Sequence, residues 1–257
     1  MIVDLNCDMG EGFGIYRLGD DAEMLTVATS ANIACGFHAG DPLVMHETLR
    51  GASANGVQAG AHPSFLDLWG FGRRPIHGER PADIEKAVLY QVGALLALAQ
   101  DAGCSVRHVK THGAMGNMAN EDADLALAVA RAIRTLDRDL IFVVMPGLET
   151  EKAGEKLGLP IAREIYADRA YADDGTLVSR KLPGAVLHDP DTVTERVARM
   201  LEDSAITCLS GRRIPTRIDT VCVHGDTPGA VVMGRRLRED CATKGIAVRP
   251  MAEVLGV

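Results

Sequence analysis

Short apolar runs alternate with longer amphipathic stretches along the whole chain. The apolar runs predict eight β-strands, at Ile2–Leu5, Ala31–Cys35, Val57–Ala61, Val106–Lys110, Leu140–Met145, Ile161–Tyr166, Ala185–Leu187 and Thr220–Val223. Apolar residues at intervals of three and four predict helices between them, at Pro42–Asn55, Ala82–Ala102, Asp122–Leu136, Thr192–Leu201 and Gly229–Thr243. This alternation predicts an α/β fold with a mainly parallel sheet.

Capping residues mark several helix starts, and the composition shows no break along the chain. Both features favour a single closed domain. Asp41-Pro42 and Thr227-Pro228 each place a capping residue before a proline at the first helical position, and Asp20 or Asp21 is a candidate cap for a short helix after it. A linker rich in proline or serine is absent from the sequence, so residues 1–257 are expected to form a single domain. Seven or eight strand–helix units favour a closed (β/α) barrel over an open sheet.

Polar side chains follow nearly every predicted strand. They are Asn6, Asp8, His38, His62, Lys110, His112, Asp168, Arg169, His188, His224 and Asp226. In parallel α/β folds the active site lies at the carboxyl ends of the strands. The sequence therefore predicts that most of these groups share one site.

Some of these residues also have a structural explanation. Asp41 is better explained as a helix cap than as a catalyst, whereas Thr227 occupies the corresponding cap position after Asp226 and leaves that carboxylate available. His188 precedes a helix-entry turn, and both explanations remain open for it. His108 alternates with its neighbours along a strand, so we expect a packed or outward-facing ring.

Two basic residues at strand ends indicate a small anionic substrate. Lys110, at the end of a buried strand, requires a carboxylate or an anionic ligand, because burial of an unpaired charge is costly. Asp8 or Glu11 would be natural partners. Arg169 offers a planar fork for a carboxylate or phosphate.

The glycine-rich segment DLNCDMGEGFG, residues 4–14, is not a recognisable phosphate-binding loop. Its glycines follow a GxGxG spacing, which matches neither the P-loop nor the dinucleotide-binding fingerprint. The segment is instead expected to be a flexible loop that carries Asp8 and Glu11 at the barrel mouth.

A divalent metal is compatible with the same groups. Asp8, His38 and His62, each after a successive strand, would supply one carboxylate and two imidazoles, with water in the open position. Alternatively, these groups contact the substrate and transfer protons directly. The sequence leaves both possibilities open.

Composition excludes several classes of protein. The chain is 47% hydrophobic but only 4% aromatic, which suits a core of aliphatic side chains. The net charge is −8 and basic residues occur at most in pairs, so a nucleic-acid binder is not expected. The N-terminus lacks signal-peptide features and no apolar run reaches the roughly 18 residues of a membrane helix. Six scattered cysteines without a CxxC pair indicate reduced thiols in a cytoplasmic protein.

Seven sequence blocks carry a family resemblance. They are DLNCDMGEGFG, NIACGFHAGDP, GAHPSFLDLWGFGRR, VKTHGAMGN, YADRAYADDGTLVSR, GAVLHDP and VCVHGDTPGAV. In this order, over nearly the whole chain, they resemble the LamB/YcsF family, the A subunits of prokaryotic ATP-dependent 5-oxoprolinase. Thr111 and Gly116 stand where the family usually has proline and tyrosine, and Leu66 stands where proline is common. These departures leave the charged candidates intact.

The resemblance implies a distorted (β/α) barrel of seven or eight strands, of the glycoside hydrolase/deacetylase type. It also implies opening of the lactam of 5-oxo-L-proline to L-glutamate, driven by ATP with Mg²⁺, in a complex with subunits B and C. The expected catalytic residues are Asp8, Glu11, His38, His62, His112 and Asp226, and the expected substrate-binding residues are Asn6, Lys110, Arg169 and His224. Two alternatives are a stand-alone metal-dependent amidase or deacetylase, and a non-catalytic substrate-binding subunit.

Overall fold

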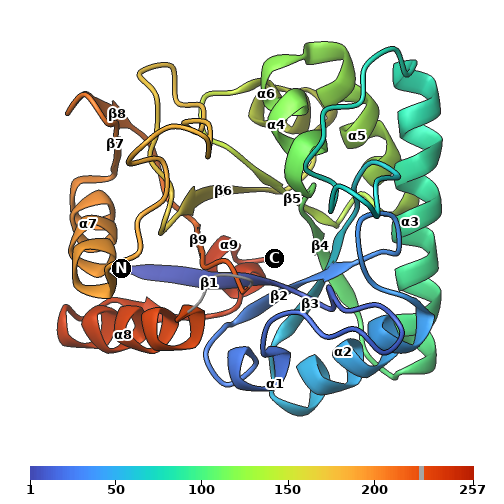
Figure 1. Ribbon diagram of the computed structural model, residues 1–257, viewed down its shortest axis with the longest axis horizontal. Helices are drawn as coiled ribbons and strands as arrows, with labels where there is room; N and C mark the ends of the chain where they lie inside the picture. Colours follow the sequence, from blue (N-terminus) through green and yellow to red (C-terminus); the bar gives the residue numbers. More distant parts are fainter. Residues whose placement is uncertain (226–228) are drawn as a thin grey trace.

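Seven parallel strands close into a barrel in the computed structural model, which describes residues 1–225 and 229–257 (Figure 1). The strands are β1 (Ile2–Met9), β2 (Ser30–Ala34), β3 (Gln58–His62), β4 (Val106–Val109), β5 (Ile141–Val144), β6 (Ile161–Tyr166) and β9 (Thr220–Cys222). The last strand pairs with both β6 and β1 and so closes the barrel, while β10 (Ala247–Val248) pairs with the start of β1. The predicted barrel of seven or eight mainly parallel strands is confirmed.

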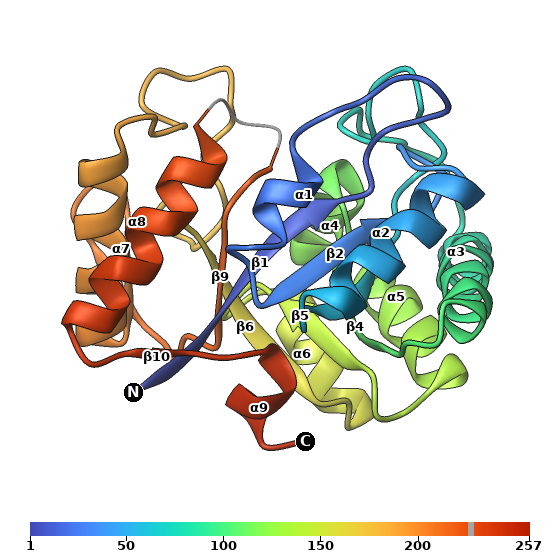
Figure 2. The same ribbon diagram turned by 90° about the horizontal axis from the view of Figure 1, so that it is seen from below.

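Helices surround the barrel and cover its outer face (Figures 1 and 2). They are α1 (Asp21–Met24), α2 (Pro42–Ala54), α3 (Pro81–Asp101), α4 (Gly113–Glu121), α5 (Ala123–Leu136), α6 (Glu149–Leu157), α7 (Pro190–Asp203), α8 (Ala230–Thr243) and α9 (Met251–Leu255). Asp41 caps α2, because its carboxylate accepts from the N–H groups of Leu43 and Val44. Asp20 caps α1. The predicted cap Thr227 lies outside the described residues. Among the described helices, none is both long and apolar enough to cross a membrane.

One predicted strand was wrong. Residues 185–187 belong to the loop between β6 and α7, where Val186 forms a single antiparallel bridge with Arg169. The backbone of this apolar run is satisfied within the loop, since the Ala185 carbonyl accepts from the N–H of Ala170. Sequence patterns also missed the helices α4 and α6, and the hairpin of β7 (Ala205–Thr207) and β8 (Arg213–Pro215).

The inside of the barrel is polar, whereas its outer face is apolar. Along β1 the side chains of Val3, Leu5, Cys7 and Met9 join the hydrophobic core, and alternate positions face inward. Inward side chains that form buried hydrogen bonds across the barrel include Asp4, Asn6, Ser30, Asn32, His108, Lys110, Glu164 and Thr220. At the amino end of the strands, α9 closes the barrel and buries Met251 against Ile141, Val143 and Ala162 (Figure 2).

These polar groups satisfy one another. The carboxylate of Asp4 accepts hydrogen bonds from the hydroxyls of Thr29, Ser30 and Thr220. The ring of His108 donates from Nε2 to Asn32 Oδ1 at 2.8 Å, and burial lowers the pKa of His108 to about 3. Gly60 makes room for this ring, because a Cβ at that position would lie 2.1 Å from Nε2. His108, which the sequence predicted to be packed or outward-facing, is thus packed inside the barrel.

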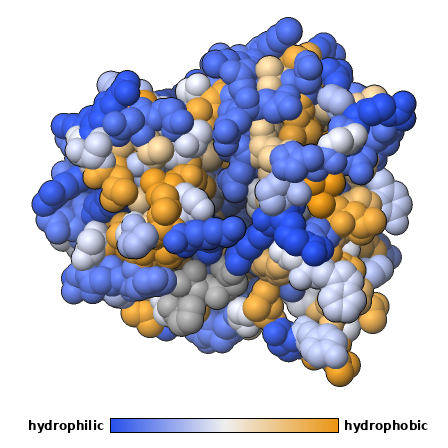
Figure 3. Space-filling view, turned by 45° about the horizontal axis from the view of Figure 1, so that its top comes forward, coloured by the Kyte–Doolittle hydropathy of each residue, from blue (hydrophilic) through white to orange (hydrophobic). Residues whose placement is uncertain are grey.

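The opposite end of the barrel is built from the loops that follow the strands, which lie together at the top of Figure 2. Several of these loops expose large apolar side chains to solvent. The loop after β1 exposes Phe13, Ile15 and Tyr16, and the loop after β3 exposes Leu66 and Trp69, the latter 96% exposed. Elsewhere hydrophilic residues cover much of the face seen in Figure 3, and hydrophobic residues appear in separate patches.

The buried Asp4 carboxyl makes stability depend on pH. Burial raises its pKa from 3.8 to about 6, so the native state binds a proton that the unfolded chain has released over this range. Its contribution to stability is therefore present at low pH and lost as pH rises through 6. We expect the unfolding free energy of the wild type, relative to Asp4→Asn, to fall by about 2–3 kcal/mol between pH 4 and pH 7.

Urea unfolding at several pH values measures this difference. Asp139→Asn, at an exposed position, serves as the control for removal of a carboxyl group. A flat profile for Asp4→Asn would contradict the argument.

Candidate active site

A cavity of about 430 Å³ opens at the carboxyl end of the barrel. The sequence-predicted residues that line it are Asp8, Glu11, His62, Lys110, His112, Arg169 and His224. His38 lies behind the lining and contacts it through Glu11. Asn6 lies below the cavity, and its amide is bonded to protein groups on both sides, so this placement gives no support to a substrate contact. Asp226 lies outside the described residues.

Lys110 forms the centre of a buried ion-pair network beneath the cavity. Its Nζ lies 3.2 Å from Asp8 Oδ1, 2.8 Å from Glu164 Oε1 and 3.0 Å from Cys222 Sγ. Burial alone would lower the pKa of Lys110, but the surrounding carboxylates outweigh it and hold this pKa well above its usual value. The lysine is therefore a permanent cation that neutralises two buried acids. Of its two predicted partners, Asp8 contacts it and Glu11 does not.

Asp8 is ionised at neutral pH. Burial tends to raise its pKa, but the charges of His62 and Lys110 outweigh burial and hold it well below the usual range. Its Oδ2 lies 3.3 Å from His62 Nε2. A carboxylate held at so low a pKa is a weak general base, because efficient proton transfer requires a pKa near the working pH. Asp8 is better suited to hold charge and orient His62.

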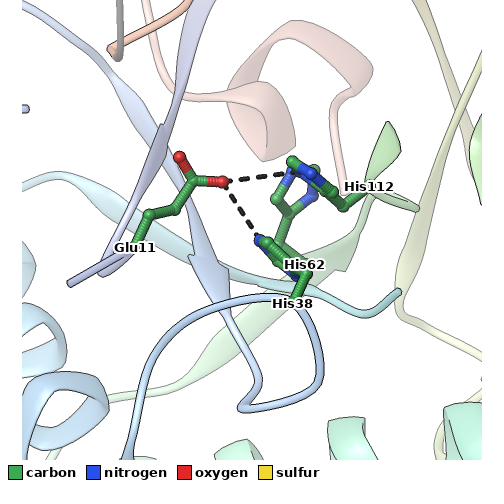
Figure 4. A group of neighbouring side chains, drawn as sticks. All are labelled: Glu11, His38, His62 and His112. Carbon is green, nitrogen blue, oxygen red and sulfur yellow. Dashed lines mark hydrogen bonds and ion pairs between the residues drawn. The ribbon is translucent and has the colours of Figure 1, made fainter. Parts of the chain in front are cut away.

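Glu11 faces three histidines that come from three different strand ends (Figure 4). Its Oε1 lies 3.1 Å from His38 Nε2 and 3.4 Å from His112 Nδ1. The rings of His38 and His112 are stacked with centroids 3.7 Å apart, and His62 meets His112 edge-on. Burial, together with the neighbouring imidazoles, lowers the pKa of both His38 and His112 well below 6.5. Both are therefore neutral at pH 7.

The loop after β3 packs closely against the side chains of His38 and His112. Gly72 adopts a φ of +63°, and a Cβ there would lie 2.8 Å from both His38 Cβ and His112 Cδ2. The preceding residue, Phe71, has a φ of +54°, a conformation that costs energy for a bulky side chain. Its carbonyl accepts a hydrogen bond from His112 Nε2 at 2.9 Å. The strained turn thus fixes the orientation of one histidine.

A second part of the cavity is cationic. His224 donates from Nδ1 to Asp168 Oδ1 at 2.7 Å and stacks on Tyr166, while Arg180 approaches His224 Nε2 at 3.3 Å. Arg169 donates to the backbone carbonyl of Val178. Within the described part of the chain, no carboxylate lies within 4.0 Å of either guanidinium group of Arg169 or Arg180. These two arginines leave positive charge available at the cavity wall.

Sequence reasoning missed Glu164 and Arg180, and it did not use Arg73, which also lines the cavity. The signal for Glu164 was weaker than that for the polar residues of β1, because Arg163 beside it interrupts the alternation of polar and apolar positions along β6. Arg180 belongs to a long loop whose path no local pattern predicts. Thr111 and Gly116 both line the cavity, and a Cβ at Gly116 would lie 3.0 Å from Thr111 Oγ1.

Comparison with known proteins places the chain in a family. Residues 3–256 match the model of the LamB/YcsF family. The chain belongs to the LamB/YcsF family. The A subunit of 5-oxoprolinase from Rhodopseudomonas palustris is 56% identical over 98% of this chain and 99% of that protein, and the one from Nitrobacter hamburgensis is 52% identical over 97% and 98%.

Solved structures agree with this family and fold. A lactam utilization protein from Thermus thermophilus has 40% identity and a TM-score of 0.91, over 97% of this chain and 99% of that one. A "T48 deacetylase" has a TM-score of 0.51 at 12% identity, over 99% and 90%, which indicates a shared fold alone. The LamB/YcsF resemblance stated from sequence motifs is confirmed.

Removal of the buried lysine charge should strongly destabilise this LamB/YcsF chain. Lys110→Met leaves Asp8 and Glu164 buried without their cation, and we expect a loss of about 3–5 kcal/mol in the free energy of unfolding. Adding Glu164→Gln removes one of the two stranded charges and should restore part of the loss.

Urea denaturation measures the free energy of unfolding of the wild type and of these variants. Lys181→Met, an exposed lysine at the same mouth, is the control and should change stability by less than about 0.5 kcal/mol. A loss below about 1 kcal/mol for Lys110→Met would show that the network is dispensable.

Proposed function

We propose that this chain is the A subunit of an ATP-dependent 5-oxoprolinase, which opens the lactam of 5-oxo-L-proline to give L-glutamate. The observation that carries the proposal is a small cavity in which acids and histidines lie beside Arg169 and Arg180, for which the described residues supply no carboxylate within 4.0 Å. The names of the 5-oxoprolinase A subunits and of the lactam utilization protein support the same reaction.

The substrate matches the charge distribution of the cavity. 5-Oxoproline carries one carboxylate and one neutral lactam on a five-membered ring. Arg169 and Arg180 are the proposed partners of the carboxylate, because a guanidinium binds a carboxylate through paired hydrogen bonds. The lactam then faces Asp8, Glu11 and the histidines, which is where bond breaking requires proton transfer.

Lactam opening needs activation, because the amide is stabilised by resonance. In the proposed route the lactam oxygen takes the γ-phosphoryl group of ATP and ADP leaves. Water adds to the activated carbon, the ring C–N bond breaks, and the nitrogen takes a proton. A second water then releases phosphate from the resulting acyl phosphate. One ATP, bound with Mg²⁺, is consumed per ring, and phosphoryl transfer is assigned to the assembled complex.

The acids and histidines of the cavity are proposed to orient water and to transfer protons in these steps. Glu11 and His112 lie side by side at the carboxyl end of the barrel and are proposed to position and polarise the attacking water. Asp8 holds His62 in place from the other side. His224, oriented by Asp168, is near enough to Asp8 to serve the leaving nitrogen. These roles differ from a simple Asp8 base, since the pKa of Asp8 is too low.

Partner subunits B and C belong to the proposal. The relatives are named as one subunit of an enzyme, which supports a complex. Exposed apolar side chains on the loops around the mouth, of which Trp69 is the most exposed, are typical of protein contact surfaces. A partner seated there would also exclude water from the reaction.

A stand-alone metal-dependent amidase or deacetylase is the second candidate. The convergence of Glu11 with three histidines favours it, because such groups bind divalent ions. It differs from the main proposal in needing neither ATP nor partners. A substrate-binding subunit without catalytic groups is disfavoured, since buried ionisable clusters in cavities are costly and typical of catalysis.

Reconstitution separates these possibilities. The chain is combined with subunits B and C, and glutamate formation from 5-oxoproline is measured with and without ATP. We expect turnover only in the complete mixture with ATP, and a loss of about 10²-fold or more for Asp8→Asn in a complex that still assembles. Glutamate produced by the chain alone without ATP would overturn the proposal in favour of the amidase.

Arg180 should act on substrate affinity rather than on chemistry. Arg180→Ala removes one charge-assisted hydrogen bond to the substrate carboxylate, and we expect KM for 5-oxoproline to rise about 10-fold or more with kcat nearly unchanged. Arg199→Ala, an exposed arginine on α7, is the matched control and should leave both constants unchanged. An unchanged KM for Arg180→Ala would remove this arginine from the substrate site.

A further inference from the structure

Two histidines in the cavity point ring nitrogen atoms at each other. His62 Nδ1 lies 2.7 Å from the carbonyl oxygen of Lys110, and His112 Nε2 lies 2.9 Å from that of Phe71. A carbonyl oxygen only accepts, so each of these nitrogens carries the hydrogen. A neutral imidazole has a single N–H. When both rings are neutral, His62 Nε2 and His112 Nδ1 carry lone pairs, although they lie 3.0 Å apart.

The neighbouring carboxylates add further acceptors to the same point. Glu11 Oε1 lies 3.4 Å from His112 Nδ1, and Asp8 Oδ2 lies 3.3 Å from His62 Nε2. Acceptor atoms packed this closely repel one another unless a cation lies between them. A tetrahedral metal with bonds of about 2.0–2.1 Å holds its ligand atoms about 3.3 Å apart. His112 Nδ1 lies at 3.0 Å from His62 Nε2 and at 3.4 Å from Glu11 Oε1, and the ligand atoms of all three residues lie within 4.8 Å of one another.

We propose that Glu11, His62 and His112 form a binding site for a transition-metal dication of the zinc type. Imidazole nitrogen with one carboxylate oxygen is a donor set that such ions prefer. Three protein ligands leave a position for water or substrate. Glu11 is assigned rather than Asp8, because its carboxylate and the ring nitrogens of the histidines all lie within 4.8 Å of one another. This site differs from the set Asp8, His38 and His62 that the sequence left open as a possible metal site.

The surroundings of the two histidines fit this assignment. Histidines that bind metals usually donate their other N–H to a carbonyl or carboxylate, which fixes the ring and its tautomer. The carbonyls of Lys110 and Phe71 serve this purpose here. The strained backbone at Phe71 is retained where it aims one of these carbonyls, and features of this kind cluster at functional sites.

His38 has a different part in the site. Its Nδ1 is buried and has no hydrogen-bond partner among the described residues, so a hydrogen placed there would be unsatisfied. The hydrogen is therefore better placed on Nε2, which donates to Glu11 Oε1 at 3.1 Å. We assign His38 to the positioning of Glu11 rather than to metal binding. The assignment does not rest on the proposed lactam reaction.

Metal binding to the purified full chain tests the proposal without an activity assay. The protein is stripped with a chelator and titrated with Zn²⁺ and with Co²⁺ at about pH 7.5 by calorimetry, elemental analysis and absorption. We expect one ion per chain and a Co²⁺ spectrum of low coordination number. His62→Gln and His112→Gln should abolish stoichiometric binding, whereas His38→Gln should weaken it about 10–100-fold. His46→Gln, on α2 away from the cavity, should bind as the wild type does.

Nitrogen NMR of the wild type covers the case in which a variant fails to fold. The metal-free protein should show hydrogen on His62 Nδ1 and His112 Nε2, and Zn²⁺ should shift His62 Nε2 and His112 Nδ1 but leave a hydrogen on His38 Nε2. Absence of stoichiometric binding would mean that only a proton bridges the two rings, and would overturn the proposal. Equal binding by His62→Gln, or loss of binding in His46→Gln, would do the same.

Discussion

The structure depends on one buried charge, the ammonium group of Lys110 inside the barrel. An ion in such a place is tolerated only with opposite charge and hydrogen-bond partners around it, and Asp8, Glu164, Asn6 and Cys222 surround it. The buried polar groups around Lys110 require hydrogen-bond partners of their own, and the polar network therefore continues through the barrel interior to Asp4. In this barrel, buried ion pairs and hydrogen bonds hold the interior together. In most barrels of this type, packed aliphatic side chains fill the interior instead. The site at the mouth is built on that rigid base.

Local patterns predicted much of this architecture. The strand–helix alternation was enough to predict the barrel, and the gathering of polar groups after the strands was enough to locate the cavity, because the carboxyl ends of parallel strands lie at one end. Lys110 was recognised as a group that needs an acid, because a buried charge requires a partner. The mistaken strand at 185–187 shows the limit of the method. Three apolar residues look alike in a barrel strand and in a loop that pairs with itself, as Val186 does with Arg169.

What the sequence could not show are contacts between distant segments. Nothing local indicates that Glu11 meets His38 and His112, or that Glu164 shares Lys110 with Asp8. These contacts depend on how far each loop reaches and on which face each strand turns inward. The alternation of polar with apolar residues along β1 did carry such information, since three polar positions two residues apart on a buried strand require polar surroundings. The orientation of individual rings, by contrast, is decided by single backbone carbonyls.

The closed amino end of the barrel affects how ligands enter and leave the cavity. Because α9 seals the amino end and side chains fill the interior, the mouth is both the way in and the way out. A product must leave before the next ligand can enter, so the two steps compete for one passage. Any protein that covers the mouth during chemistry must also uncover it once in every cycle. In enzymes whose active site is covered in this way, opening and closing can limit the rate as much as the breaking of a bond does.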